Sequence, residues 1–302
     1  MTTPPPGTPA RLCILTVHAH PDDESSKGAG TIAKYAAAGV HTVLVCATDG
    51  AAGEILNPAM DRPEVKDNLP EVRMGELARA AEIIGYREVV HLGYKDSGMS
   101  ETPANEDPAC FWRADLDEAV GRLVAIIRRT RPQVVVTYGE DQQGYPHPDH
   151  LRVHDISLPA FDLAGDPSYR PDLGEAWEPL KLYYTAWSRQ RMVAMHEKFL
   201  ELGLESPLGE RFLDRPSQDE AVTTKIDVSG HMPARREALL AHATQIDPNS
   251  PFWFGLPPEV LDTVYPVEDY VLARSRVSPS GTTGAEGAYE DDLFAGVVVP
   301  AG

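Results

Sequence analysis

The sequence contains little positive charge. Lys and Arg total 27 against 46 Asp and Glu, which gives this chain of 302 residues a formal net charge of −19 at pH 7. A protein that binds nucleic acid or an anionic membrane needs a positive surface to attract phosphate groups. We therefore expect neither kind of partner.

Cysteine is also scarce, and long apolar runs are missing. The three cysteines, Cys13, Cys46 and Cys110, are far apart and form no C-x-x-C pair, so neither a disulfide framework nor a thiolate zinc site is indicated. The sequence has no apolar run of 18 residues, and its first residues lack the basic and apolar segments of a signal peptide. We expect a cytoplasmic protein.

The remaining composition is typical of a folded protein. Hydrophobic residues make up 42% and charged residues 24% of the chain, which excludes disorder of the whole chain. We expect a flexible leader over residues 1–11, a single domain over 12–275 with a cap that begins near residue 166, and a mobile tail over 276–302. The tail prediction rests on its content of Gly, Ser, Thr and acidic residues.

Apolar runs alternate with segments of helical periodicity in the first half of the chain. Strands are expected at 12–17, 42–48, 88–92 and 133–138, and helices at 27–38, 71–84 and 116–129. The chain then enters a loop rich in Gly, Pro and His. Further strands at 180–186 and 222–228 and helices at 189–202 and 233–245 form the expected cap. Because parallel strands need crossover connections, the pattern predicts an α/β fold, a mostly parallel sheet with helices on both faces.

Two polar motifs follow predicted strands. The first strand runs into His18-Ala19-His20-Pro21-Asp22-Asp23-Glu24, and the fourth is followed by Gly144-Tyr145-Pro146-His147-Pro148-Asp149-His150. Ligands of parallel sheets bind beyond the carboxyl ends of the strands, so both motifs should reach one edge of the sheet. Together they offer imidazoles and carboxylates without sulfur, as a divalent metal ion requires.

The spacing suggests a role for each residue. His20, Asp23 and His150 would supply the three protein ligands of a catalytic zinc ion, which keeps one position for water. Asp22, next to a ligand, is the candidate general base for that water. His147 could be held by Asp149 and, with Tyr145, stabilise a developing oxyanion or protonate the leaving amine.

Each motif by itself also fits a simpler interpretation. A Pro-Asp-Asp-Glu-Ser segment after a strand is a plausible turn and helix N-cap, in which the helix dipole favours the acidic side chains. The presence of both motifs at strand ends of one α/β unit favours the metal site.

These residues carry a family resemblance. Residues 19–24 and 147–150 resemble the signature pair of the PIG-L/LmbE-like family of zinc-dependent N-deacetylases and amidases. Residues 25–28, 53–60 and 144–146 resemble the branch of that family that cleaves the cysteinyl-glucosaminyl amide of mycothiol S-conjugates. The likeness covers most of residues 12–275.

The resemblance implies a Rossmann-like fold and a glucosaminyl-inositol thiol conjugate as the small-molecule substrate. It also implies that His20, Asp23 and His150 are the metal ligands, that Asp22 is the base, and that His147 and Tyr145 act on the oxyanion side. The donor set also accommodates Fe²⁺ or another divalent ion in place of zinc. The sequence leaves the oligomeric state open.

Other functions remain open at this stage. One alternative is an N-acetylglucosaminyl-inositol deacetylase, and another is a non-catalytic protein that binds a sugar or a metal. A nucleotide-binding oxidoreductase is disfavoured, because the first strand-to-helix turn lacks the G-x-G-x-x-G spacing that a pyrophosphate needs.

The substrate contacts are less clearly marked. Residues 47–53 read Ala-Thr-Asp-Gly-Ala-Ala-Gly, where the amidase branch has a glycine-rich polar segment, so a related thiol conjugate is also a candidate substrate. Lys27, Glu54 and Arg73 are candidate substrate contacts, although such charges are often only solvated. The run of residues 251–254, Pro-Phe-Trp-Phe, could roof a pocket for an apolar conjugate or simply belong to the core.

Overall fold

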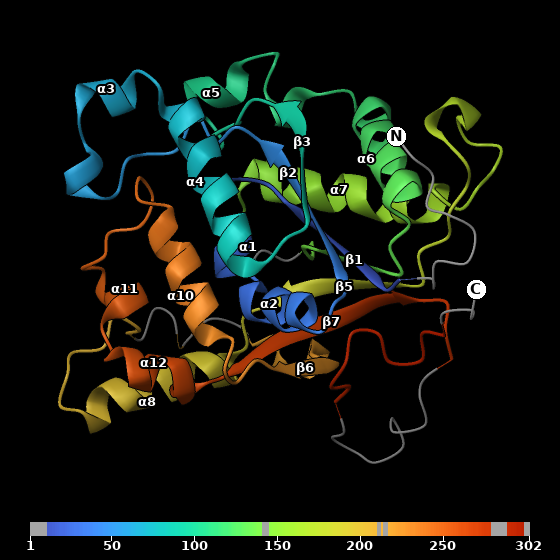
Figure 1. Ribbon diagram of the computed structural model, residues 1–302. Coiled ribbons are helices and arrows are strands. Elements are labelled where there is room, and N and C mark those ends of the chain that lie inside the picture. Colours follow the sequence, from blue (N-terminus) through green and yellow to red (C-terminus); the bar gives the residue numbers. More distant parts are fainter. Residues whose placement is uncertain (1–10, 141–144, 210–212, 214–216, 279–288, 299–302) are drawn as a thin grey trace.

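A computed structural model describes residues 11–140, 145–209, 213, 217–278 and 289–298. The described chain forms a seven-stranded sheet in the order β3-β2-β1-β4-β5-β7-β6 (Figure 1). Its strands are β1 Cys13–His18, β2 His41–Thr48, β3 Glu88–Tyr94, β4 Val134–Thr137, β5 Lys181–Ala186, β6 Thr224–Asp227 and β7 Val267–Ser275. Of the expected leader, all but Arg11 lies outside the described residues.

The sheet is mostly parallel, which confirms the predicted fold class. β1 pairs in parallel with β2 and β4, β2 pairs in parallel with β3, and β4 pairs in parallel with β5. Among the strands of the described residues, only β7 runs antiparallel, to β5 on one side and β6 on the other. Every residue of β1 is buried, as expected for a central strand covered on both faces.

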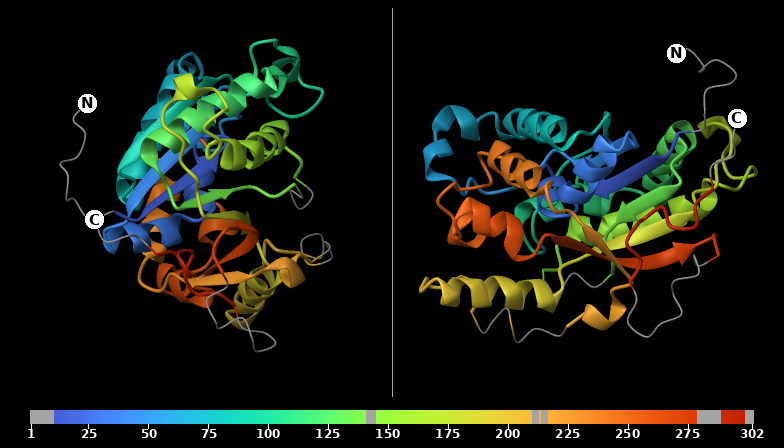
Figure 2. Two further views of the ribbon diagram at one scale, coloured as in Figure 1. Left: turned by 90° about the vertical axis from the view of Figure 1, so that its right-hand side faces the viewer. Right: turned by 60° about the horizontal axis from the view of Figure 1, so that its bottom comes forward.

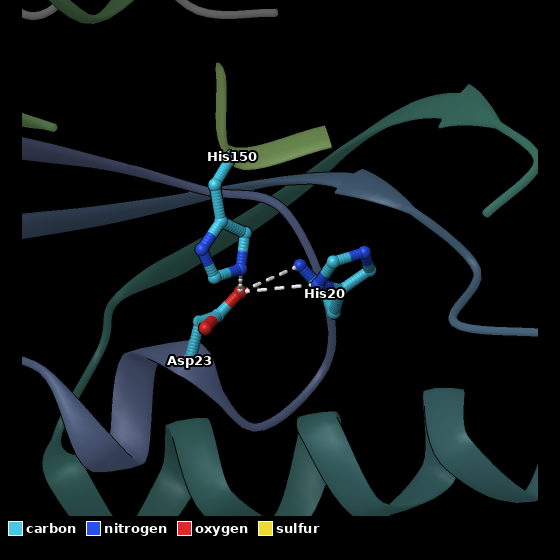
Figure 3. A group of neighbouring side chains, drawn as sticks. All are labelled: His20, Asp23 and His150. Carbon is cyan, nitrogen blue, oxygen red and sulfur yellow. Dashed lines mark hydrogen bonds and ion pairs between the residues drawn. The ribbon is translucent and has the colours of Figure 1, made fainter. Parts of the chain in front are cut away.

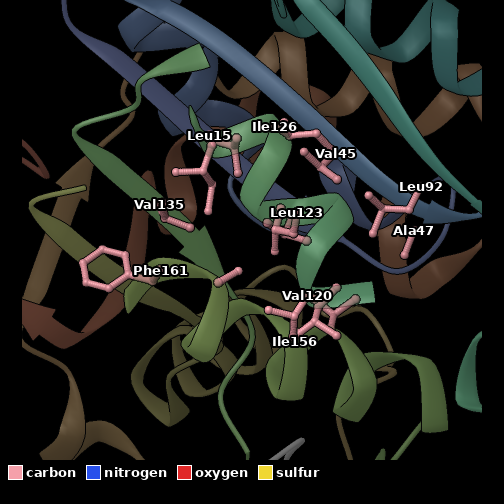
Figure 4. Packing of buried hydrophobic residues seen from close by; sticks show 14 of the residues in the cluster. Leu15, Val45, Ala47, Leu92, Val120, Leu123, Ile126, Val135, Ile156 and Phe161 are labelled. Carbon is pink, nitrogen blue, oxygen red and sulfur yellow. The ribbon is translucent and has the colours of Figure 1, made fainter. Parts of the chain in front are cut away.

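Helices cover both faces of the sheet (Figure 2). One face packs against α2 Ala29–Ala37, α4 Leu69–Ile84 and α10 Met232–Ala241, and the other packs against α6 Leu116–Thr130 and α7 Pro148–Leu163. Figure 4 shows the second layer, where Leu15 and Val135 of the sheet meet Leu123 and Ile156 of the helices. Full burial of a side chain of this kind stabilises a fold by roughly 1.5–3 kcal/mol, so this layer fixes the strand ends firmly.

Shorter elements complete the chain. The remaining helices of the described residues are α1 Asp23–Ser26, α3 Pro63–Lys66, α5 Pro103–Glu106, α8 Arg189–Glu201, α11 Pro251–Phe254 and α12 Pro258–Val264. Single 3₁₀ turns lie at Pro58–Met60, Phe111–Arg113, Pro171–Leu173 and Asp219–Ala221. No helix in the described part of the chain has the length and apolarity needed to cross a membrane.

The helix expected at 27–38 is present as α2 Ala29–Ala37, and a separate short helix, α1 Asp23–Ser26, lies before it. Lys27 ends α1, and Gly28 adopts φ +95° before α2 begins. A side chain at Gly28 would bring a Cβ within 3.0 Å of the Tyr270 hydroxyl, so both the backbone angle and the space favour glycine. The break lets Asp23 and Lys27 turn toward the sheet edge while α2 packs on the core.

A helix follows the second motif, where the sequence analysis expects a loop. Pro148 occupies the first turn of α7, and the Nδ1 atom of His147 accepts a hydrogen bond from the backbone N–H of Asp149 at 3.2 Å. Proline suits this position because its missing N–H would have no partner there. The residues Pro146, His147 and Pro148, which suggest a loop by their composition, therefore lead into the first turn of a helix.

The segment after residue 166 does more than cap the domain. Its strands β5, β7 and β6 complete the sheet. β7, for which the sequence analysis predicts no element, is the antiparallel partner of the other two. Its helices α8, α11 and α12 lie together at the lower edge of the molecule in Figure 1.

Part of the expected mobile tail is built into the core, which corrects that prediction for residues 289–298. Leu293 and Phe294 are 0% and 6% exposed. The Glu290 carboxylate accepts hydrogen bonds from Lys181 Nζ at 3.0 Å and from the Tyr183 hydroxyl at 2.7 Å. Composition misses these contacts because they depend on partners more than 100 residues away. Residues 279–288 and 299–302 of the expected tail lie outside the described residues.

Candidate metal centre

Three side chains from the two motifs meet beyond the carboxyl ends of β1 and β4 (Figure 3). His20 follows β1, Asp23 begins α1, and His150 lies in the first turn of α7. The Oδ2 atom of Asp23 lies 3.4 Å from His20 Nδ1 and 3.3 Å from His150 Nε2. The sequence thus predicts a cluster that the fold does assemble.

The chemistry of this cluster fits a divalent cation. One ligand atom from each residue lies within 4.8 Å of the other two, and all three residues are buried. Burial lowers the pKa of His20, but hydrogen bonds to Asp149, Asp23 and Asp96 outweigh it and raise that pKa well above its ordinary value. The surrounding carboxylates therefore favour positive charge at this point. Two imidazole nitrogens and one carboxylate form a donor set typical of catalytic zinc sites.

His147 is held by the backbone N–H of Asp149, whereas the Asp149 carboxylate contacts His20. Its Oδ2 atom lies 3.1 Å from His20 Nε2 and accepts the Ser97 backbone N–H at 2.9 Å, and its Oδ1 accepts the Ser97 hydroxyl. Asp149 is 0% exposed. A neutral His20 ring that donates its Nε2–H to this carboxylate carries its lone pair on Nδ1, the nitrogen that faces Asp23. Nδ1 is then free to bind a metal ion together with Asp23.

His147 caps α7 with its ring. Because Nδ1 accepts the backbone N–H of Asp149, the neutral ring carries its proton on Nε2. Burial and then the charge of His20 lower the pKa of His147 to about 4, which keeps it neutral near pH 7. Its ring centroid lies 4.5 Å from that of His20. His147 is therefore a neutral N–H donor beside the candidate metal ligands.

Asp22 is held in a strained backbone conformation. Its φ is +120° and ψ −25°, which is unfavourable for a residue with a side chain. The conformation is fixed by Glu24, whose Oε2 accepts the Asp22 N–H at 3.0 Å, and by Arg73, whose Nη2 donates to Asp22 Oδ2 at 3.0 Å. Burial raises the pKa of Asp22, and the positive charge of Arg73 opposes the rise.

Arg73 is a buried cross-link between loops that also lines the cavity, and its role as a sugar contact stays a prediction. The side chain is buried and donates to the backbone oxygens of Gly50 at 2.6 Å and Pro21 at 2.5 Å as well as to Asp22. A Cβ at Gly50 would lie 2.6 Å from this guanidinium, and φ there is +66°. Glycine is required at that position because the arginine passes against its backbone.

The other predicted contacts line the same cavity. Lys27 Nζ forms an ion pair with Asp23 Oδ1, the oxygen on the side away from His20 and His150, and so it also positions a candidate ligand. Tyr145 is 54% exposed, with its ring centroid 6.1 Å from that of His147. Glu54 is exposed at the cavity wall. Gly144 of the second motif lies outside the described residues.

The sequence analysis missed two groups that support the site. Asp96 and Ser97 follow β3, and the strand-end rule that finds the two motifs could have found them as well. The second group is a fully buried pair, Glu24 and His242, whose Oε1 and Nε2 atoms are 2.6 Å apart. No local signal marks His242, because its partner is 218 residues away.

A cavity of about 1090 Å³ opens over the cluster. Toward the ends of β2 and β3 its wall includes the charged side chains of Glu54 and Asp96. Toward the end of β5 its wall is aromatic, with Trp187, Phe252 and Trp253 packed together at centroid distances of 4.8–6.1 Å. We refer to the part of the wall with Glu54 and Asp96 as the polar flank and to the part with Trp187, Phe252 and Trp253 as the aromatic flank.

The chain is similar to characterised proteins over nearly all its length. Residues 15–161 match the PIG-L family, described as GlcNAc-PI de-N-acetylase. The mycothiol S-conjugate amidase of Streptomyces coelicolor is 43% identical over 95% of this chain and 98% of its own. The 1D-myo-inositol 2-acetamido-2-deoxy-alpha-D-glucopyranoside deacetylase of Geodermatophilus obscurus is also 43% identical, over 96% of this chain and 99% of its own.

Solved structures share the fold at lower identity. N,N'-diacetylchitobiose deacetylase from Pyrococcus horikoshii superposes with a TM-score of 0.59 at 17% identity and covers 86% of this chain and 83% of its own. The 4-carboxy-2-hydroxymuconate hydratase of Pseudomonas putida KT2440 gives a TM-score of 0.57 at 18% identity, with 88% and 98% covered. At these identities the likeness concerns the fold alone. From the match to residues 15–161 and the full-length identity of 43%, we conclude that the chain belongs to the PIG-L family, whose deacetylases and amidases depend on a metal ion.

Proposed function

We propose that this protein hydrolyses the amide bond of a glucosaminyl-inositol thiol conjugate, in the manner of a mycothiol S-conjugate amidase, with zinc as its metal. The observation that carries the proposal is the buried cluster of His20, Asp23 and His150 with Asp22 beside it at the floor of a large cavity. The family membership and the names of the relatives support the same activity. Iron or another divalent ion would suit the same donors.

The residues around the cluster have distinct tasks in this proposal. A divalent ion held by His20, Asp23 and His150 would polarise the amide carbonyl and acidify a water molecule. Asp22 accepts the proton of the attacking water, and its raised pKa brings it closer to the range in which a carboxylate base works well. The N–H of His147 and the hydroxyl of Tyr145 donate to the carbonyl oxygen as negative charge develops on it.

The two flanks of the cavity suggest how the substrate lies. The polar flank with Glu54 and Asp96 suits the hydroxyl groups of a sugar and an inositol. The aromatic flank with Trp187 and Trp253 suits an apolar group on the sulfur of the acyl part. An acetyl group alone would leave most of this flank empty, which favours the amidase over a deacetylase.

A second candidate is N-acetylglucosaminyl-inositol deacetylase. The observation in its favour is the Geodermatophilus obscurus deacetylase, which is as similar to this chain as the amidase is. Both reactions cleave an amide of glucosamine and differ only in the acyl group.

Matched substrates separate the two candidates. Purified protein is given two amides of the same glucosaminyl-inositol, one with an acetyl group and one with an S-benzyl-N-acetylcysteinyl group, and the released acids are measured by mass spectrometry. We expect kcat/KM to be at least about tenfold higher for the larger acyl group, since burial of one apolar side chain contributes roughly 1.5–3 kcal/mol. A preference for acetate release would favour the deacetylase, and release of neither acid would refute amide hydrolysis.

Replacement of Asp149 tests the support for His20. In Asp149→Asn the carboxylate that accepts from His20 Nε2 becomes an amide, and we expect metal affinity to fall by roughly 10–100-fold, as for other partners of metal-bound histidines. Competition with a fluorescent zinc chelator measures the change. Asp155→Asn, an exposed residue on the same helix, is the control and should bind metal as the wild type does. Equal affinity in the two variants would show that Asp149 does not support the ligand.

A further inference from the structure

A second, smaller cavity lies behind the aromatic flank. It has a volume of about 30 Å³ and shares Trp187, Met192, Phe252 and Trp253 with the large cavity, so these side chains separate the two spaces. Two arginines line the small cavity, Arg191 from α8 and Arg235 from α10. Most of its other wall is apolar, from Met195, Leu208, Met232, Leu261 and Val264.

Neither arginine has a hydrogen-bond acceptor for its guanidinium among the described residues. Arg235 is 5% exposed, and its Nε is buried without a partner. Both guanidinium groups contact aromatic rings: Arg191 lies over Trp187 at 4.9 Å, and Arg235 lies over Trp253 at 5.8 Å. A guanidinium carries five N–H donors, and burial of such a charge without an acceptor is unfavourable.

The acidic groups whose charge acts on these arginines are bound elsewhere. Asp269 accepts from the Ser188 hydroxyl at 2.6 Å and from Tyr265 at 3.1 Å. Glu268 accepts the backbone N–H groups of Gly30 and Thr31 at 3.1 and 2.8 Å. The negative charges of Glu268 and Asp269 therefore attract Arg191 without a hydrogen bond to it. Positive charge is thus concentrated in a small space of a protein whose net charge is −19.

The pKa of Arg235 agrees with this geometry. Burial and then the positive charge of Arg191 lower it to about 9, and the opposing effect of Glu268 does not compensate. Among the described residues, no carboxylate in hydrogen-bond contact balances the two like charges that line this apolar space. An anion in that space would accept from both guanidinium groups and remove the repulsion.

We propose that the cavity between Arg191 and Arg235 binds one small anionic group, a carboxylate or a halide ion. The volume has room for about one such group and excludes a sugar phosphate. The planar guanidinium fork is suited to a carboxylate, and the apolar wall removes competing water. Because the same arginines lie over Trp187 and Trp253, the bound anion fixes the rings that form the aromatic flank of the large cavity.

Two sources could supply this anionic group, and both present the same chemistry to the arginines. It is either a free ion from solution or a carboxylate on the acyl part of a molecule that occupies the large cavity and reaches past Trp187. The site itself does not depend on the proposed hydrolysis, since binding can be measured without turnover.

Bromide provides a direct probe. Crystals of the wild-type protein soaked in sodium bromide should give an anomalous peak between the two guanidinium groups. In solution, replacement of sodium gluconate by sodium bromide or acetate at constant ionic strength should raise Tm by about 3–5 °C at 100 mM, as expected for millimolar binding to a chain of this size. Gluconate is too large for the cavity and serves as the inert anion.

Neutral variants of each arginine complete the test. Arg191→Met and Arg235→Met keep much of the side-chain volume and should lose both the bromide peak and the rise in Tm. Arg236→Met, which removes a neighbouring arginine paired with Asp262, should retain them. If one methionine variant does not fold, the other provides the comparison.

Binding of two matched amides shows whether the anion is a free ion or part of the bound molecule. Succinyl and butyryl amides of the same glucosamine differ by a terminal carboxylate. If the carboxylate comes from the bound molecule, Arg235→Met weakens binding of the succinyl amide by about tenfold and leaves the butyryl amide unchanged. If the ion is free, both amides bind alike and bromide still binds. Absence of a bromide peak, or an equal Tm response in the wild type and both methionine variants, would overturn the proposal.

Discussion

Substitution of Asp23 by Asn is expected to remove bound metal and hydrolysis together. The Oδ2 atom of Asp23 lies within 3.4 Å of both candidate imidazole ligands, so it is the group that joins them in one site. An amide oxygen is neutral and a weaker ligand for a divalent ion. The loss of metal affinity should exceed the roughly 10–100-fold effect of changing a residue that only supports a ligand, and turnover should fall to background.

The measurement pairs metal analysis of purified protein with turnover of the S-benzyl amide. His20→Ala and His150→Ala should behave as Asp23→Asn does. His91→Ala is a suitable control, because this exposed histidine lies on β3 away from the cluster, and it should keep full metal content and activity. An Asp23→Asn protein that retains a full equivalent of metal would mean that the ion is bound elsewhere.

Substitution of Asp22 by Asn is expected to leave the metal in place and lower kcat by about 10²–10⁴-fold, the usual contribution of a general base. An amide side chain accepts no proton at neutral pH. The substitution should leave the fold intact, because asparagine tolerates positive φ and its amide oxygen still accepts from Arg73. Metal content, circular dichroism and steady-state kinetics measured on one preparation separate these effects.

The pH profile gives an independent check on Asp22. Burial raises the pKa of the Asp22 carboxyl above its usual value, and the group must be ionised to accept a proton. Wild-type activity should therefore fall as the pH is lowered through that raised pKa, and this acidic limb should be missing from the residual activity of Asp22→Asn. Asp61→Asn, on the exposed segment before α3, should show the wild-type profile. A variant of Asp22 with unchanged kcat would assign the base to another group.

Much of the site can be predicted from the sequence because its ligands follow strands. Periodicity locates β1 and β4, and the strand-end rule then brings His20, Asp23 and His150 to one edge of the sheet. The same rule applies to Asp96 and Ser97 at the end of β3, so these residues were within reach of sequence reasoning.

The partner of each charged group is harder to predict. Asp149 is two residues from His147, yet α7 turns its carboxylate toward His20 and leaves its N–H for His147. Arg73, on α4, donates to Asp22 and to the backbone oxygen of Gly50 at the wall of the cavity. These contacts depend on how helices pack against loops that are distant in the sequence. The spacing of residues within a motif does not reveal that packing.

The prediction of the fold fails for a similar reason at residues 289–298, where long-range contacts decide the structure. The acidic and glycine-rich sequence around residue 290 is typical of a mobile segment, but Glu290 pairs with Lys181, which is 1% exposed. A buried lysine needs a carboxylate partner, and the sequence does not reveal which one. Composition describes the segment correctly and still gives the wrong structure for residues 289–298.

Fold likeness does not determine the chemistry. The hydratase of Pseudomonas putida shares the fold with a TM-score of 0.57, and its name describes a different reaction from that of the deacetylases. The site and the full-length relatives at 43% identity therefore support the proposed function of this chain more strongly than the fold does.

Anomalous diffraction at the zinc edge, on crystals of protein loaded with one equivalent of zinc, tests the central claim most directly. We predict one strong peak within coordination distance, about 2.0–2.2 Å, of Nδ1 of His20, Oδ2 of Asp23 and Nε2 of His150. A peak outside this cluster, or none in crystals of protein that turns over the amide, would contradict the account.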